Sequence, residues 1–171
     1  MSREVRRVPP TWVHPKDDRG RYQPMFDRDF LAEAREWMDA AIAWDNGTDA
    51  DAATEKAGHP FYWQWNGGPP DPQYYMPSWP FEERTHYQMY ETTSEGTPIS
   101  PIMESPELLA RWLVDNNASA FGGGGASYEG WLRVCRGGYA PSLVIQGGRM
   151  MSGVDALKAS TAGVATREGA P

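Results

Sequence analysis

The residues with side chains suited to catalysis or metal binding are few and far apart. The chain has three histidines, His14, His59 and His86, and one cysteine, Cys135. These four residues are not spaced as a recognisable zinc motif, so we expect no metal and no cofactor. His14 and His59 each precede a proline, which favours a role in local turn geometry over a role in chemistry.

An acid–base pair for hydrolysis is conceivable around His86, which is followed by Glu91 and Glu95. Residues 86–92 alternate as a strand, however, and this places His86 on the opposite face from both glutamates. Cys135 falls on the apolar face of a predicted helix, where a thiol is an unreactive core residue. No serine here stands in a nucleophile-elbow pattern. An enzyme is therefore the less favoured interpretation.

A run of four glycines, Gly122, Gly123, Gly124 and Gly125, comes shortly before Ser127 and a predicted helix. A glycine loop at a helix N-terminus can hold an anion, because free backbone N–H groups point at the ligand. This run lacks the lysine and Ser/Thr of a phosphate loop, and no strong strand precedes it. We interpret it as a hinge or linker and keep a small-molecule or nucleotide site at these five residues as the alternative.

The clearest structural pattern lies in residues 85–116. Residues 86–92 alternate as a strand rich in aromatic and β-branched side chains, and a polar turn ending in Gly96 follows. Ser105, Pro106 and Glu107 form a strong helix start, because serine caps, proline suits the first helical position and glutamate opposes the helix dipole. The sequence therefore predicts a strand, a turn and a helix over this stretch.

Three further patterns complete the predicted elements. A helix near residues 29–45 has a continuous apolar stripe, and a second helix near 127–136 follows the glycine run. Residues 142–152 read as a hairpin around Gly147 and Gly148. The aromatic run at 61–65 reads as a compact strand. The apolar stripe of the first helix consists of Phe30, Ala34, Trp37, Ala41 and Trp44.

These elements predict a small α+β fold. We expect an antiparallel sheet built from the strands near 61–65, 86–92 and 142–152, packed against the helices near 29–45, 105–116 and 127–136. By composition, residues 1–24 form an extended N-terminal arm, residues 25–158 a single α+β domain, and residues 159–171 a flexible C-terminal tail.

The charge of the chain is uneven. The formal net charge is −7, with +3 over residues 1–21, −10 over residues 22–100 and zero over residues 101–171. A large basic face is therefore not expected, and neither is direct binding of nucleic acid. The acidic middle could meet a basic partner protein, or its carboxylates could simply solvate the surface.

The most unusual composition is the block of aromatic and proline residues at 59–80. Rigid aromatic and proline surfaces serve well at protein interfaces, and they serve equally as a lid over a small core. Both interpretations remain open from the sequence. The predicted partner-binding residues are Trp63, Trp65, Tyr74, Tyr75, Trp79, Glu82 and Glu83.

No signal in the sequence points to a membrane or to secretion. No apolar run approaches the roughly 20 residues needed to span a bilayer. The N-terminus has basic residues but no apolar stretch after them, which does not fit a secretory signal. One cysteine cannot form an intrachain disulfide and fits a reducing compartment. We therefore expect a cytoplasmic protein that does not enter a membrane.

The segment HYQMYETTSEGTPISPIMESPELLARWL, residues 86–113, resembles a recurrent module in bacteriophage and prophage proteins of unknown function. In that module a YQxWETxSEGxPxSPVF stretch leads into an xPEELAxWL helix. Here Tyr90 replaces the usual tryptophan, and Ile102 and Met103 replace Val-Phe. The opening REVRRVPPTWVHP, the block at 59–65 and the segments SYEGWL and APSLVIQGG are also similar, so the likeness covers most of residues 1–153. The resemblance implies a small phage protein made in the cytoplasm of a bacterial host, without implying an activity.

Three functions follow as hypotheses. The favoured one is a non-enzymatic phage accessory protein that binds a host or phage protein, with a host defence or regulatory complex as the expected target. The second is a virion or assembly component ordered by neighbouring subunits. The third is an enzyme or a binder of a small molecule or nucleotide. The sequence does not determine the oligomeric state.

Overall fold

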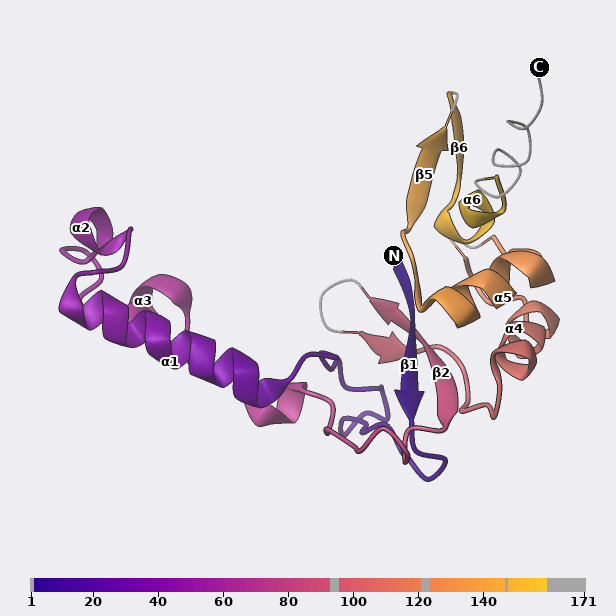
Figure 1. Ribbon diagram of the computed structural model, residues 1–171, viewed down its shortest axis with the longest axis horizontal. Helices are drawn as coiled ribbons and strands as arrows, with labels where there is room; N and C mark the ends of the chain where they lie inside the picture. Colours follow the sequence, from indigo (N-terminus) through magenta and orange to yellow (C-terminus); the bar gives the residue numbers. More distant parts are fainter. Residues whose placement is uncertain (1, 93–95, 121–123, 147, 160–171) are drawn as a thin grey trace, which may run out of the picture. The chain divides into compact units, whose positions relative to one another are not determined.

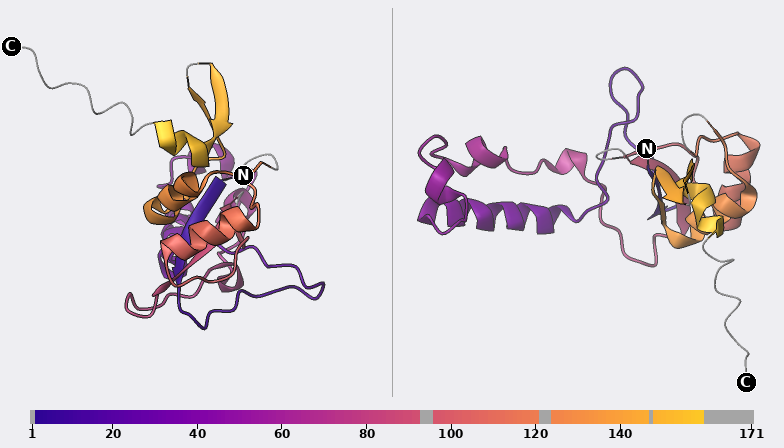
Figure 2. Two further views of the ribbon diagram at one scale, coloured as in Figure 1. Left: turned by 90° about the vertical axis from the view of Figure 1, so that its right-hand side faces the viewer. Right: turned by 90° about the horizontal axis from the view of Figure 1, so that it is seen from above.

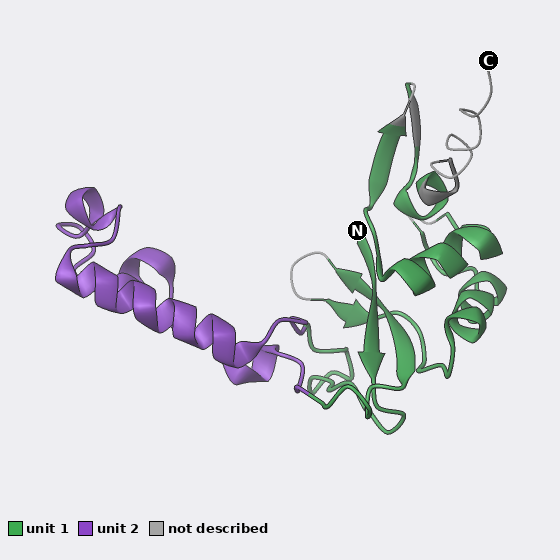
Figure 3. Ribbon diagram, viewed as in Figure 1, with its two compact units in different colours: residues 1–24, 79–171 green, residues 25–78 purple. Residues whose placement is uncertain are grey.

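The computed structural model describes residues 2–92, 96–120, 124–146 and 148–159. They form two compact units, one of residues 1–24 with 79–171 and the other of residues 25–78 (Figure 3). Residues 25–158 were predicted to form one domain, whereas the structure divides them between the two units and groups the first 24 residues with the C-terminal half. The predicted tail at 159–171 lies outside the described residues, apart from Ala159, which is the last residue of the helix Gly153–Ala159.

The first unit is built on a four-stranded antiparallel sheet in the order β3-β2-β1-β4 (Figure 1). Its two central strands pair over their full length, from Ser2 opposite Thr92 to Val8 opposite His86. The prediction of a strand at 86–92 is confirmed. The strands are β1 (Ser2–Val8), β2 (His86–Thr92), β3 (Thr97–Pro98) and β4 (Tyr139–Ala140).

The position of β1 corrects the prediction that residues 1–24 form an extended arm, because its first third is an interior strand of the sheet. In this strand Arg3 and Arg6 are both buried, and each meets a carboxylate, from Glu91 and Glu4 respectively. The strand β2, which pairs with β1 over its full length, begins 78 residues after the end of β1, so no local pattern identifies it.

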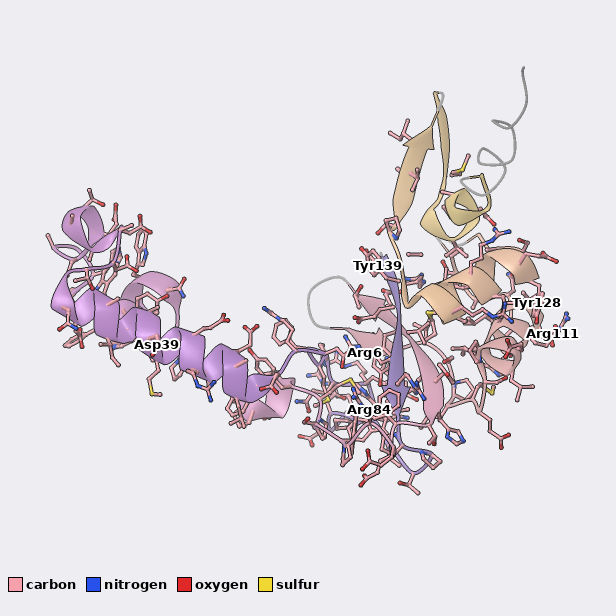
Figure 4. All side chains as sticks on the ribbon, in the orientation of Figure 1. Arg6, Asp39, Arg84, Arg111, Tyr128 and Tyr139 are labelled. Atoms are coloured by element: carbon pink, nitrogen blue, oxygen red, sulfur yellow. The ribbon has the colours of Figure 1, made fainter. Side chains whose placement is uncertain are left out.

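Three helices accompany this sheet: α4 (Pro106–Asp115), α5 (Tyr128–Gly137) and α6 (Gly153–Ala159). Figure 2 shows α4 and α5 beside each other, and Figure 4 shows Arg111 of α4 next to Tyr128 of α5, with the guanidinium 4.5 Å from the ring centroid. The predicted starts are confirmed, since Ser105 and Ser127 each accept a capping hydrogen bond in the first turn of their helix. The buried core is formed by Met89, Leu109, Ala110, Leu113, Ala120, Trp131, Val134, Cys135, Ala140 and Val154.

The predicted hairpin near 142–152 is present as β5 (Leu143–Gln146) and β6 (Arg149–Ser152). The expectation that it joins the main sheet is wrong, because these strands form a separate two-stranded sheet. The edge of the main sheet is taken instead by β4, which comes directly after α5 and pairs with β1. Gly147, one of the two predicted turn residues, lies outside the described residues.

The second unit, residues 25–78, is helical. It contains α1 (Phe30–Asn46), α2 (Ala52–Glu55), α3 (Tyr62–Asn66) and a short 3-10 helix, η1 (Pro72–Tyr74). The helix predicted near 29–45 is confirmed: Asp29 caps it by accepting from the N–H of Ala32 at 2.9 Å, and Gly47 ends it with a φ of 68°. With the helices and sheets of both units, the protein has the small α+β fold that the sequence predicted.

The prediction of a strand at 61–65 is wrong, because this run forms the short helix α3. The backbone N–H of Phe61 donates to Oε1 of Gln64 at 3.2 Å, which closes the first turn. Asn66 donates from Nδ2 to the hydroxyl of Tyr62 one turn away, at 2.8 Å. Aromatic residues favour strands by propensity, but contacts within the unit override this preference over so short a run.

Candidate interaction surface

Aromatic packing holds α3 against α1. The buried Trp44 stacks on Trp65, with ring centroids 6.0 Å apart and an interplanar angle of 18°. Tyr62 lies between Trp44 and Trp37, at centroid distances of 5.9 and 5.5 Å. The indole N–H groups of Trp44 and Trp37 donate to the carbonyl oxygens of His59 and Gly67. Part of the aromatic block is therefore the internal packing of this unit.

The start of α1 is fixed by a second aromatic group. Phe26 and Tyr75 form a parallel bridge, and the rings of Phe26 and Phe30 lie 5.2 and 5.4 Å from the ring of Tyr75. Tyr75 is buried. This corrects the prediction that Tyr75 is an exposed partner-binding residue, because it is the residue around which this end of the unit packs.

Four other aromatic side chains of the same unit are exposed, and we call them the aromatic surface: Phe61, Trp63, Trp65 and Tyr74. Phe61 and Trp63 are 56% and 54% exposed although their rings stack on each other, at 6.3 Å and 9°. Exposed tryptophan and tyrosine are the residue types that contribute most energy at protein interfaces. Three of these four residues were predicted from the sequence, and Phe61 was missed.

A second exposed apolar group, which we call the α1 stripe, consists of Leu31, Met38 and Ile42. Spacings of seven and four residues place the three side chains on one face of the helix. Leu31 is 68% exposed, and the other two are 56% exposed. This stripe was not predicted, because the predicted apolar stripe of α1, from Phe30 to Trp44, lies at neighbouring positions of the helix.

The charge is concentrated in the same unit. Residues 25–78 contain ten Asp or Glu and three Arg or Lys, a formal charge of −7 that equals the net charge of the whole chain. The formal charges of the remaining residues therefore sum to zero. One of the cations, Lys56, donates to the carbonyl oxygens of Trp44 and Asp45 at 2.7 Å each. Its positive charge there faces the partial negative charge at the C-terminal end of α1.

The other predicted partner-binding residues, Trp79, Glu82 and Glu83, belong to the first unit. Trp79 is half-buried and packs edge-on against Trp12 at a centroid distance of 4.9 Å, whereas both glutamates are exposed. The predicted set is thus divided between the two units. The aromatic surface and ten acidic residues both belong to the unit of residues 25–78.

The alternative site at the glycine run is described only in part, because Gly122 and Gly123 lie outside the described residues. Gly124 accepts a backbone hydrogen bond from Ala120 at 2.7 Å. The hydroxyl of Ser127 is engaged as the cap of α5, accepting from Gly130 at 3.2 Å. The described part of this segment therefore makes structural contacts, and the side chain of Ser127 is occupied as a helix cap.

The residues considered for chemistry are dispersed. In the described part of the chain, no group of three His, Cys, Asp or Glu side chains could hold a metal ion. Cys135 is buried, and burial, assisted by the charge of Glu107, raises the pKa of its thiol to about 12. His86 contacts the hydroxyl of Thr85 through Nδ1 at 2.9 Å. Cys135 is therefore a buried core residue, as the sequence predicted.

A search of known families, curated proteins and solved structures found no significant match to this chain. Across the described ranges, no helix has the length and apolar character needed to cross a membrane. The fold and the surface define a small α+β protein with an acidic helical unit that exposes aromatic and aliphatic side chains.

Proposed function

We propose that residues 25–78 bind a protein partner whose surface is basic at its rim and apolar at its centre, and that the chain acts through this contact. The observation that supports the proposal most directly is the coincidence of the aromatic surface, the α1 stripe and the −7 charge in one unit. Each feature alone is common on protein surfaces, but together they match the composition of an interface.

The small internal core of this unit supports the same conclusion. Its buried hydrophobic residues are few: Met25, Trp44, Ala52, Tyr75 and Met76. Seven large apolar side chains of the unit remain exposed. Complete burial of a side chain of this size contributes roughly 1.5–3 kcal/mol. A partner that covers even half of them would stabilise both the contact and the unit.

The charge indicates the kind of partner. A surface of −7 attracts a basic protein and speeds their encounter, and this attraction weakens as salt rises. The same charge opposes pairing with a second copy of the chain, because two acidic units repel each other. A different protein with a basic face is therefore the expected occupant.

The resemblance in the sequence supports a cytoplasmic phage accessory protein. On this proposal the partner belongs to a bacterial defence or regulatory complex, many of which handle nucleic acid and have basic surfaces that an acidic protein can occupy. A phage structural protein as the partner would favour the virion or assembly role instead.

The test has two stages. Tagged protein is used to capture partners from infected and uninfected bacterial lysate, and each candidate is then purified and its Kd measured. We expect Trp63→Ala to weaken the purified complex at least about tenfold, which corresponds to about 1.4 kcal/mol. The matched control is Leu108→Ala, which removes an exposed apolar side chain from α4 in the other unit.

The salt dependence completes this test. Raising the salt from about 0.05 M to 0.5 M should weaken the wild-type complex, because the Debye length falls from above 10 Å to below 5 Å. Equal effects of Trp63→Ala and Leu108→Ala would refute the assignment of the interface to residues 25–78. Binding that is indifferent to salt would refute the basic character of the partner.

A further inference from the structure

Helix α1 carries two apolar rows on adjacent faces, and they differ in how well they are covered. The first is the predicted stripe that runs from Phe30 to Trp44. Its residues are packed: the ring of Phe30 contacts Tyr75, and the rings of Trp37 and Trp44 contact those of α3. The second row is the α1 stripe, whose three side chains are each more than half exposed.

The second row repeats the spacing of the first. The first row occupies positions 30, 34, 37, 41 and 44, which alternate spacings of four and three. With Arg35 included, the second row occupies positions 31, 35, 38 and 42 and has the same alternation. Such a row is the seam along which one helix packs on another. The arginine does not interrupt it, because an arginine stem can lie along apolar surface with its charged head in water.

The dimensions of the α1 stripe suit a single helix. From Leu31 to Ile42 it spans about 16 Å, or three turns, at about 1.5 Å per residue. The backbone groups in the middle of α1 are bonded within the helix, so this face offers a partner side chains and no strand edge to extend. A second helix makes the matching contact, because it presents a row of apolar side chains with the same spacing.

The charge beside the α1 stripe indicates what lies along the partner helix. At 3.6 residues per turn, Glu36 and Asp39 fall on the side of the stripe away from the face that packs on α3. Both are exposed, and Figure 4 labels Asp39 on α1. Glu33 is paired with Arg28, whereas Glu36 and Asp39 make no ion pair within the described residues. Lys or Arg side chains along one flank of a partner helix complement these two carboxylates.

We propose, on the basis of the proposed function, that the partner binds the α1 stripe with one amphipathic helix. This helix has an apolar row at spacings of three and four, and Lys or Arg on the flank that meets Glu36 and Asp39. A second copy of α1 does not fit this description, because its own flank is acidic and like charges repel. The proposal thus assigns the contact to one type of secondary structure with one sign of charge.

The first test compares two synthetic peptides that carry a fluorescent label. One has about 21 residues, with leucine at the seam positions of three heptads and lysine on the flanks. The other has the same composition in an order that leaves no apolar row on any helical face. Fluorescence anisotropy with the full chain gives the Kd of each at about 0.15 M salt. We expect the ordered peptide to bind at least about tenfold more tightly. Equal affinities would show that charge alone attracts the peptides, and they would overturn the proposal, as would no measurable binding of the ordered peptide.

A charge placed in the α1 stripe separates apolar docking from simple attraction. Met38→Glu makes the unit more acidic, so attraction alone would strengthen binding of the ordered peptide. Docking on the stripe predicts the opposite, a loss of at least about tenfold, because the added carboxylate must be buried. Met38→Leu keeps the position apolar and should bind like the wild type. Val13→Glu adds the same charge at an exposed apolar position of the other unit and should not weaken binding. Undiminished binding to a folded Met38→Glu variant would overturn the proposal.

The position of the bound peptide can be observed directly in the wild-type chain. The NMR signals of methyl-labelled methionine report on each methionine separately, and Met38 is identified by the signal that Met38→Leu lacks. We expect the Met38 methyl signal to shift as the ordered peptide is added. Met103, a half-buried methionine of the other unit, is the internal control and should not shift. A Met38 signal that stays in place at saturating peptide would overturn the assignment to the α1 stripe.

Two variants tested with the natural partner separate the bound helix from the proposed function as a whole. A partner that loses affinity in Met38→Glu and Trp63→Ala supports both. A partner that loses affinity in Trp63→Ala but not in Met38→Glu would keep the interface in residues 25–78 and overturn only the helix on the α1 stripe. Unchanged affinity in both variants would refute the helix and the interface together.

Discussion

Arg3 on β1 and Glu91 on β2 are direct cross-strand partners, and Nη1 of Arg3 lies 3.3 Å from Oε2 of Glu91. Arg3 is 1% exposed and also donates from Nε to the carbonyl of Ser119 at 2.8 Å. Burial lowers the pKa of this guanidinium, and the charge of Glu91 opposes that decrease. The pair therefore keeps a charged group inside the sheet and fixes the register of its two central strands.

We expect Glu91→Gln to lower the free energy of unfolding by about 2 kcal/mol, because a buried guanidinium loses its negative partner. The partial exposure of Glu91 keeps the loss below that of a fully buried pair. Urea unfolding followed by circular dichroism measures the change. Glu33→Gln, which breaks the more exposed pair with Arg28, is the control and should cost less than about 1 kcal/mol. Equal losses in the two variants would contradict the structural role of the Arg3–Glu91 pair.

Gly153, at the start of α6, allows a close approach to the backbone of Pro141. A Cβ at this position would overlap the carbonyl oxygen of Pro141 and lie 2.7 Å from its carbonyl carbon. Since neither atom belongs to a flexible side chain, we expect Gly153→Ala to destabilise the fold by about 2 kcal/mol or more in thermal unfolding. Gly137→Ala places a methyl group in open space at the end of α5 and should change stability by less than about 1 kcal/mol. A Gly153→Ala variant with unchanged stability would show that α6 does not pack on Pro141.

Two tryptophans of the second unit should affect different properties. Trp44 should affect the stability of the unit, and Trp63 should affect the binding of a partner. Trp44 is fully buried against α3, so Trp44→Ala should cost roughly 3–5 kcal/mol and reduce the helical signal of residues 25–78. The exposed Trp63 contributes little to the unit itself, so Trp63→Ala should stay within about 1 kcal/mol of the wild type. Urea unfolding and far-ultraviolet circular dichroism measure both. A large loss in Trp63→Ala would mean that this residue belongs to the core, and would remove it from the proposed interface.

The reactivity of Cys135 reports on the packing of α5. With a thiol pKa of about 12, only about one molecule in ten thousand has the reactive thiolate at pH 8. We expect alkylation by iodoacetamide to be at least about a thousandfold slower in the native protein than in urea, where the thiol has its ordinary pKa and is accessible. Mass spectrometry of timed samples gives both rates. Rapid alkylation without denaturant would contradict the burial of this thiol.

The sequence predicted best those elements whose signals are local. Asp29, Ser105 and Ser127 each stand immediately before an apolar stripe, and each caps a helix close to the predicted position. The short helix α3 was predicted as a strand because its aromatic residues favour strands, whereas its conformation depends on packing around Trp44. The strand β1 was missed because both its buried arginines and its pairing partner depend on residues far along the chain.

The candidate surface was predicted in part for a similar reason. Composition identified Trp63, Trp65 and Tyr74 as interface residues, and the structure exposes all three. Composition alone could not separate Tyr74 from its buried neighbour Tyr75, because adjacent residues of one type can face opposite sides. The α1 stripe was missed because a helix with two apolar faces shows only its stronger one as a clear period.

The −7 charge of residues 25–78 and the α1 stripe give two salt dependences of opposite sign. Binding of a basic partner should weaken with salt, whereas association of two copies should strengthen, because salt screens their repulsion and leaves apolar burial in place. We therefore expect the purified chain to be monomeric at about 0.05 M salt and to self-associate weakly at about 1 M, where the Debye length is about 3 Å. Sedimentation equilibrium at both salt concentrations measures this.

The residues responsible can be identified by adding one charge. Met38→Glu places a carboxylate in the middle of the α1 stripe and should abolish the association at high salt, since a charged group is costly to bury at an interface. Val13→Glu adds the same charge at a more exposed apolar position of the other unit and should leave the association unchanged. If Val13→Glu and Met38→Glu reduce the association equally, the added net charge is the cause of the effect. The α1 stripe would then have no role in self-association.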